Sequence, residues 1–141
     1  MSTNESATAT PLRPADGDEL DEVLAAHDTV LVEFYTKGCA LCQAMEPVLG
    51  NVAREMGAKR ASRNERAGSE ATHESRATDV TVAMVNPGED IGLVDRFDIR
   101  SVPTLLLVRD GEEVARLADG FTGAGDVVTF LERHTEEAVE G

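Results

Sequence analysis

The stretch VLVEFYTKGCALC, residues 30–42, decides how this chain folds. Its first part, residues 30–35, is a β-branched and aromatic run interrupted only by Glu33, which predicts a buried strand. From residue 39 to residue 56 the apolar side chains recur at helical spacing, which predicts a helix with one buried face. Cys39 and Cys42 therefore stand where a strand passes into the N-terminus of a helix.

This position favours dithiol chemistry. Unpaired backbone N–H groups and the positive end of the helix dipole should stabilise a thiolate at Cys39. The spacing of the two cysteines places both sulfurs on one side of the first helical turn, within reach of an intramolecular disulfide. Cys42 lies further into the helix and should be more shielded. We therefore expect Cys39 to attack a substrate disulfide and Cys42 to resolve the mixed disulfide.

Outward from this stretch, further runs predict a mixed sheet. Residues 11–14 suit a short edge strand, and a helix capped by Asp16 or Asp18 should follow and end near His27. Apolar runs at 80–85, 104–108 and 114–117 predict three more strands, the last two joined by an Asp110-Gly111 hairpin turn. A short helix is expected at 88–97 with Ile91 and Val94 facing inward, and a final helix carries Val127, Val128, Phe130 and Leu131. Two parallel connections through helices and a terminal hairpin imply an α/β fold with helices on both faces of the sheet.

The domain organisation follows from where apolar residues are missing. Residues 1–10 are polar and predict a flexible tail, residues 11–136 form one domain, and residues 137–141 form a short C-terminal tail. Residues 57–79 contain no large apolar side chain, so we expect a polar insertion, either a solvated loop or a frayed extension of the preceding helix. The basic residues of this insertion suit a solvated surface better than a docking site for an acidic partner.

The charge balance excludes several function classes. The chain carries 13 Lys and Arg against 27 Asp and Glu, a net charge of −14. Such a surface repels nucleic acid and anionic membranes, and no run is long enough to span a bilayer. Lys37 and Lys59 are the only lysines, and an acidic, lysine-poor surface is typical of proteins from salt-accumulating halophiles. The polar N-terminus lacks a secretory signal pattern, so we expect a cytoplasmic protein.

From about residue 12 to residue 134 the chain resembles thioredoxin. The resemblance rests on VLVEFYTKGCALC, on Pro47 in the same helix, on DIRSVPTLLLVRDGEEV at residues 98–114, and on Gly120. It implies the thioredoxin fold, with a mixed central sheet of parallel strands and a C-terminal antiparallel hairpin. It also implies reduction of protein disulfides without a cofactor or metal. The partners are client proteins with disulfides and a thioredoxin reductase or another dithiol donor, and a monomer is expected.

The resemblance also implies roles for residues around the cysteines. The proline matching Pro103 is cis in this family and faces the cysteine pair, where its loop offers backbone groups to an extended peptide. We expect the client to contact six residues: Gly38, Ala40, Leu41, Val102, Pro103 and Gly120. Glu33 stands where the family carries a buried acid, and a desolvated carboxyl there has a raised pKa and can accept the Cys42 proton. Alternatively, Glu33 could lie on a solvated face of the strand. Lys37, next to the site, could help to stabilise the Cys39 thiolate or could be only a solvated surface charge.

Departures from the family pattern leave the direction of electron flow open. The usual Trp-Cys-Gly-Pro-Cys reads Gly-Cys-Ala-Leu-Cys here, and the inner residues tune the reduction potential. Met84 replaces the lysine that often accompanies the buried acid. The alternatives to a reductase are a disulfide oxidase or isomerase, and a binding module switched by the redox state of its cysteines. Zinc binding is disfavoured, because no further cysteine exists and His27, His73 and His134 are scattered.

Overall fold

The computed structural model, which describes residues 10–67 and 80–140, is built around a four-stranded sheet in the order β2-β1-β3-β4. The strands are β1 (Thr29–Phe34), β2 (Thr81–Val85), β3 (Thr104–Arg109) and β4 (Glu112–Leu117). β1 runs parallel to β2 and antiparallel to β3, and β4 runs antiparallel to β3. This is the mixed sheet with a C-terminal hairpin that the sequence predicts.

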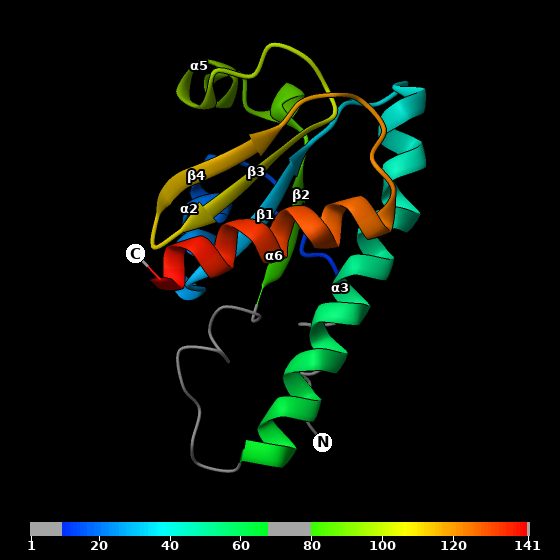
Figure 1. Cartoon of the computed structure of the whole chain (residues 1–141). Helices are drawn as coiled ribbons and strands as arrows, with labels where there is room; N and C mark the ends of the chain where they lie inside the picture. Colours follow the sequence, from blue (N-terminus) through cyan, green and yellow to red (C-terminus); the bar gives the residue numbers. More distant parts are fainter. Residues whose placement is uncertain (1–9, 68–79, 141) are drawn as a thin grey trace.

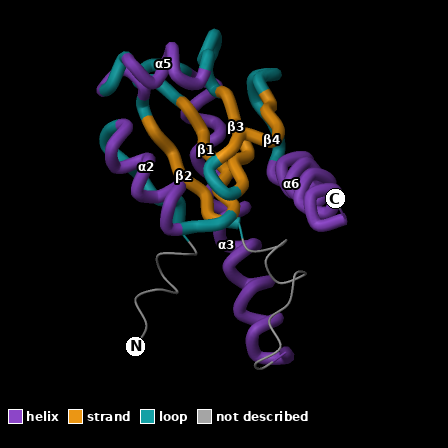
Figure 2. Tube along the Cα trace, turned by 90° about the vertical axis from the view of Figure 1, so that its left-hand side faces the viewer, coloured by secondary structure: helices purple, strands orange, loops and turns teal. Residues whose placement is uncertain are grey.

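Helices cover both faces of the sheet (Figures 1 and 2). One face packs against α3 (Ala40–Ala67) and α6 (Ala124–Glu140), and the shared core includes Leu31, Leu49, Leu107 and Leu131. The other face packs near α2 (Gly17–Ala26) and α5 (Gly92–Phe97), with a core that includes Val30 and Leu106. Neighbouring strand residues alternate between the two cores because side chains in a strand point to opposite faces.

The N-terminal segment lies along the outer edge of β2. Leu12 forms a single parallel bridge with Ala83: its N–H donates to the Val82 carbonyl, and its own carbonyl accepts from the Met84 N–H, both at 2.8 Å. The edge strand expected at 11–14 is therefore present as one bridge. The two parallel connections expected from the sequence run from this segment through α2 to β1, and from β1 through α3 to β2.

The helix after the cysteines is longer than its apolar face. Apolar spacing predicts an end at Met56, but α3 continues to Ala67, so the first part of the expected insertion is a helix extension and not a loop. Its Ala, Arg, Lys and Glu residues have high helix propensity, and elongating a formed helix fixes one residue for each new hydrogen bond. The remainder, residues 68–79, and the expected tail at 1–9 lie outside the described residues.

One expectation for the other helices is wrong. The segment 88–97 is split into a 3-10 turn η1 (Pro87–Glu89) and α5, and Ile91 at the junction is 69% exposed, whereas Leu93 is buried. The break before α5 turns a different residue toward the core than one continuous helix would. The final helix, α6, extends to Glu140 and so runs through most of the residues expected as a short C-terminal tail.

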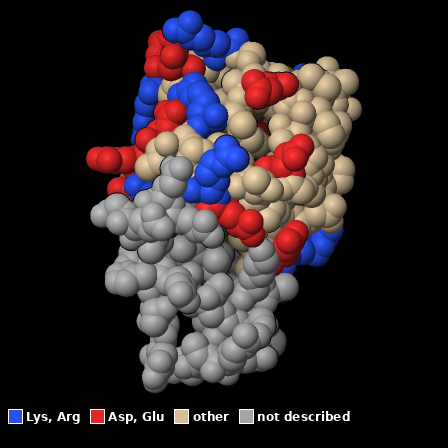
Figure 3. Space-filling model, viewed as in Figure 1, with Lys and Arg blue, Asp and Glu red and all other residues tan. Residues whose placement is uncertain are grey.

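Charged side chains are interleaved on the surface. On the face viewed in Figure 3, Lys and Arg side chains lie next to Asp and Glu side chains over the described part of the molecule. Two of the ion pairs are Arg96 with Asp21 at 2.6 Å and Arg116 with Glu113 at 2.8 Å. None of the helices in the described ranges combines the length and apolar character that a membrane span needs.

Candidate active site

Cys39 immediately precedes α3 and caps it. Its carbonyl accepts the Gln43 N–H at 3.0 Å, and its Sγ accepts the Cys42 N–H at 3.1 Å. A side-chain acceptor at this position satisfies a backbone donor that the first helical turn leaves unpaired. The turn before it uses Gly38 at φ +80°, a conformation that favours glycine. Local sequence alone therefore places the Cys39 sulfur at the exposed helix N-terminus.

The two cysteines have different environments. Both are free thiols; Cys39 is half-buried, whereas Cys42 is 4% exposed. The pKa of Cys42 is raised to about 12, chiefly by burial and also by the hydrogen bond with Cys39 and the charge of Cys39, whereas a backbone hydrogen bond with Thr36 opposes the rise. Cys39 is thus the accessible thiol, and Cys42 retains its proton in the reduced protein.

The loop before β3 lies against Cys39. The Val102–Pro103 peptide bond is cis, as the resemblance implied, and the Cys39 Sγ lies 4.0 Å from the Val102 carbonyl oxygen. Pro103 is buried, and Val102 is half-buried. These residues are about sixty positions from the cysteines in sequence, so tertiary structure brings them together.

A second loop reaches the helix from the end of β4. Gly120 has φ +87°, and a Cβ there would lie 3.5 Å from the Leu41 Cδ1. The Thr122 N–H contacts the Met45 Sδ at 3.3 Å and holds this loop against α3. Leu41 is 47% exposed, and Ala40 beside it is exposed as well. The six expected client-contacting residues therefore lie on the helix N-terminus and on the two loops beside it, and Lys37 next to them is exposed.

Glu33 lies buried beneath the site. It is 0% exposed on β1, between Met84 of β2 and Leu105 of β3, and neither carboxyl oxygen has a hydrogen-bond partner. Burial raises the pKa of Glu33 to about 8; the Glu46 carboxylate adds to this rise, and the Arg13 guanidinium opposes it. The solvated alternative for Glu33 is therefore wrong.

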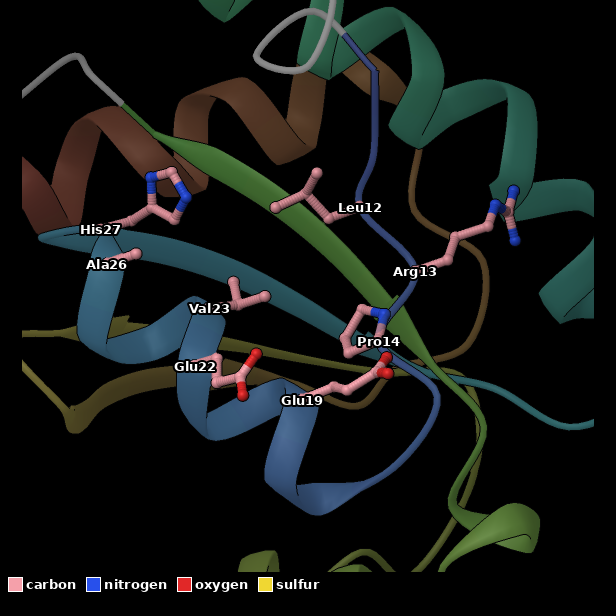
Figure 4. A pocket seen from close by; sticks show the side chains of 8 residues that line it. All are labelled: Leu12, Arg13, Pro14, Glu19, Glu22, Val23, Ala26 and His27. Atoms are coloured by element: carbon pink, nitrogen blue, oxygen red, sulfur yellow. The ribbon is translucent and has the colours of Figure 1, made fainter. Parts of the chain in front are cut away.

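The sequence did not single out Arg13 or Glu46. Glu46 lies one helical turn after Cys42, so its closeness to the site follows from i, i+4 spacing. Arg13 is drawn near only by the pairing of the N-terminal segment with β2. Its Nη2 lies 2.7 Å from the Glu46 Oε2. In Figure 4 its side chain leads away from α2 and toward α3.

The described residues offer other hollows but no evident metal centre. The hollow in Figure 4, of about 320 Å³, lies between the N-terminal segment and α2, and neither cysteine lines it. Within the described ranges, no three His, Cys, Asp or Glu side chains gather as metal ligands would. The groups that the described residues bring together at the site are two thiols, one buried carboxyl and the surrounding peptide groups.

This chain is similar to known proteins in sequence and in fold. The thioredoxin family model matches residues 13–133. The chain is 28% identical to thioredoxin of Mycobacterium tuberculosis over 80% of each protein. It is also 30% identical to chicken protein disulfide-isomerase over 92% of this chain, which spans only 23% of that relative's length.

Solved structures agree with the sequence comparisons. A mutant thioredoxin from Halobacterium salinarum NRC-1 superimposes with a TM-score of 0.71 at 29% identity, covering 92% of this chain and 94% of that one. Oxidised thioredoxin from Plasmodium falciparum, at 16% identity and a TM-score of 0.67 over 89% of this chain and 99% of that one, shares the fold.

Proposed function

This chain belongs to the thioredoxin family of thiol–disulfide oxidoreductases, and we propose that it reduces protein disulfides with Cys39 as nucleophile and Cys42 as resolving thiol. The observation that carries this assignment is the contrast between the two sulfurs. Cys39 is accessible and caps a helix N-terminus, whereas Cys42 is 4% exposed and has a pKa raised to about 12. Only Cys39 is suited to a first attack on a bulky client.

In the first step the Cys39 thiolate attacks one sulfur of the client disulfide. A mixed disulfide forms, and the second client sulfur leaves as a thiolate. The client backbone lies in an extended form along the Val102–Pro103 loop and beside the surface that Leu41 and Gly120 form together. The peptide N–H and C=O groups of such a loop suit strand-like pairing with many different sequences.

In the second step the Cys42 thiol gives its proton, through a water molecule, to the ionised form of the Glu33 carboxyl. The Cys42 thiolate then attacks the Cys39 Sγ and forms the Cys39–Cys42 disulfide, while the bond between Cys39 and the client breaks and the client sulfur that Cys39 had held leaves as a thiolate. The hydrogen bond and the charge of Cys39, which both raise the pKa of Cys42, disappear once Cys39 is covalently engaged. Resolution thus becomes easier only after the client has been captured.

Partners and location follow from this chemistry. The family implies client proteins that carry disulfides and a reductase that regenerates the dithiol. We place the protein in the cytoplasm, where reducing conditions keep both cysteines as thiols. Its net charge of −14 suits high ionic strength, at which a Debye length of ~3 Å screens repulsion between carboxylates.

Insulin reduction at high salt tests the assignment. Cys39→Ser should abolish turnover, and Cys42→Ser should accumulate covalent mixed disulfides that mass spectrometry detects. If Cys39→Ser reduced insulin at the wild-type rate, the mechanism would be wrong. If the wild-type protein retained partners in one redox state without reducing them, a redox-switched binding module would be the better description.

A further inference from the structure

We propose that Arg13 and Glu46 are positioning residues that set, with opposite sign, how tightly Glu33 holds its proton. The inference rests on the proposed role of Glu33 as the proton acceptor of Cys42. It concerns a pair of charged residues that the sequence did not connect with the site.

The sheet register places Arg13 in line with Glu33 across the neighbouring strands, with Met84 between them; we call this line the Glu33 row. Leu12 pairs with Ala83, so the next residue, Arg13, lies beside Met84, which pairs with Glu33. Successive strand residues alternate in face. Leu12 packs with Ala83 in the core under α2, whereas Met84 belongs to the core under α3. Arg13 therefore points to the α3 side, as does Glu33.

The helix supplies the opposite charge on that same side. Glu46 follows Met45, which is fully buried against the sheet, and it lies one turn beyond Cys42. The Arg13 and Glu46 side chains are about half-exposed, with 50% and 53% of their side-chain surface accessible, and they meet at 2.7 Å. Their ion pair thus connects the edge of the sheet with α3. It lies at the solvent-exposed end of the Glu33 row, whereas Glu33 lies at the buried end.

Besides Arg13 and Glu46, the neighbours of Glu33 carry little charge. The flanking strands present Met84 and Leu105, which are uncharged. From α3 the titratable groups are Cys42 and Glu46, and Tyr35 lies on the same face two residues after Glu33. α6 contributes apolar side chains to this core. With both carboxyl oxygens of Glu33 lacking partners, nearby charge is the main influence left to oppose or add to burial.

The test exploits the fact that either neutral variant breaks the same ion pair. Arg13→Gln removes the cation and should raise the pH at which Glu33 titrates. Glu46→Gln removes the anion and should lower it. A purely structural effect of losing the pair would instead move both variants in one direction. The double variant should return the midpoint toward the wild-type value.

The readout is the Glu33 carboxyl-carbon resonance followed against pH by NMR on the reduced protein, assigned with Glu33→Gln. It is measured at the lowest salt concentration at which every variant remains folded by circular dichroism. Arg96→Gln is the matched control, because the Arg96–Asp21 pair is equally short at 2.6 Å and similarly exposed at 45% and 51%. This control should leave the Glu33 midpoint unchanged.

Shifts of opposite sign support the inference; shifts of the same sign, or no shift in either variant, overturn it. The pH profile of insulin reduction is recorded in parallel and separates the two proposals. If the Glu33 midpoint moves as expected while the profile does not follow, the inference holds and the proposed use of Glu33 as proton acceptor fails.

Discussion

Replacing Glu33 by Gln should abolish a large pH dependence of folding stability. The carboxyl is 0% exposed, and its pKa is raised from 4.5 to about 8, chiefly by burial. Between these two pH values the folded state retains a proton at Glu33 that the unfolded state has released. Stability is therefore fully present below about pH 4.5 and is lost as pH rises toward 8.

The size of the effect follows from the same two values. One pKa unit corresponds to about 1.4 kcal/mol, so the raised pKa of Glu33 implies a loss of roughly 5 kcal/mol across the window. Gln matches the protonated carboxyl in shape and cannot ionise. The advantage of the variant over the wild type should thus be small near pH 5, grow as the pH rises, and reach several kcal/mol near pH 8.

Denaturant unfolding of the reduced protein at constant salt measures this difference. Free energies of unfolding are determined for both proteins at several values from about pH 5 to pH 8. Subtracting one curve from the other cancels the contributions of the remaining titratable groups. Two parallel curves over this range would refute the claim that Glu33 is held protonated by burial.

Three further predictions concern the core, a helix cap and the thiols. Leu49→Ala should cost about 2–5 kcal/mol in denaturant unfolding because Leu49 is fully buried; Ile91→Ala, at a 69% exposed residue, should change stability by less than about 0.5 kcal/mol. Asp16→Ala removes the acceptor that caps α2 and should lower the free energy of unfolding by about 1 kcal/mol, whereas Asp16→Asn should retain most of it. Brief iodoacetamide treatment of the reduced protein should label Cys39 alone, as peptide mass mapping would show; equal labelling of Cys42 would contradict its burial.

The active-site helix shows how far local sequence reaches. The apolar run of β1, the helical spacing after it and the two cysteines at the junction are encoded within neighbouring residues. Strand and helix preferences act over a few positions, so the placement of Cys39 as a cap and Cys42 inside the first turn is predictable. The same reasoning predicted the Asp110-Gly111 turn and a cap of α2 at Asp16 or Asp18, of which Asp16 is the one observed.

Two structural features were predicted less accurately, because no local pattern in the sequence signals them. The end of α3 at Ala67 depends on helix elongation that buries no apolar face. The exposure of Ile91 depends on the break between η1 and α5, which the spacing of apolar residues does not reveal.

By itself, the sequence determined that this chain forms an α/β fold around a mixed sheet, and it determined which two residues carry the thiol chemistry. Tertiary structure decided what surrounds them: the Val102–Pro103 loop against Cys39, the burial of Glu33, and the approach of Arg13 to Glu46. The physical reason is one of range. Backbone preferences and periodicity act between neighbours, whereas desolvation and charge–charge interactions depend on which distant segments the sheet register brings into one row.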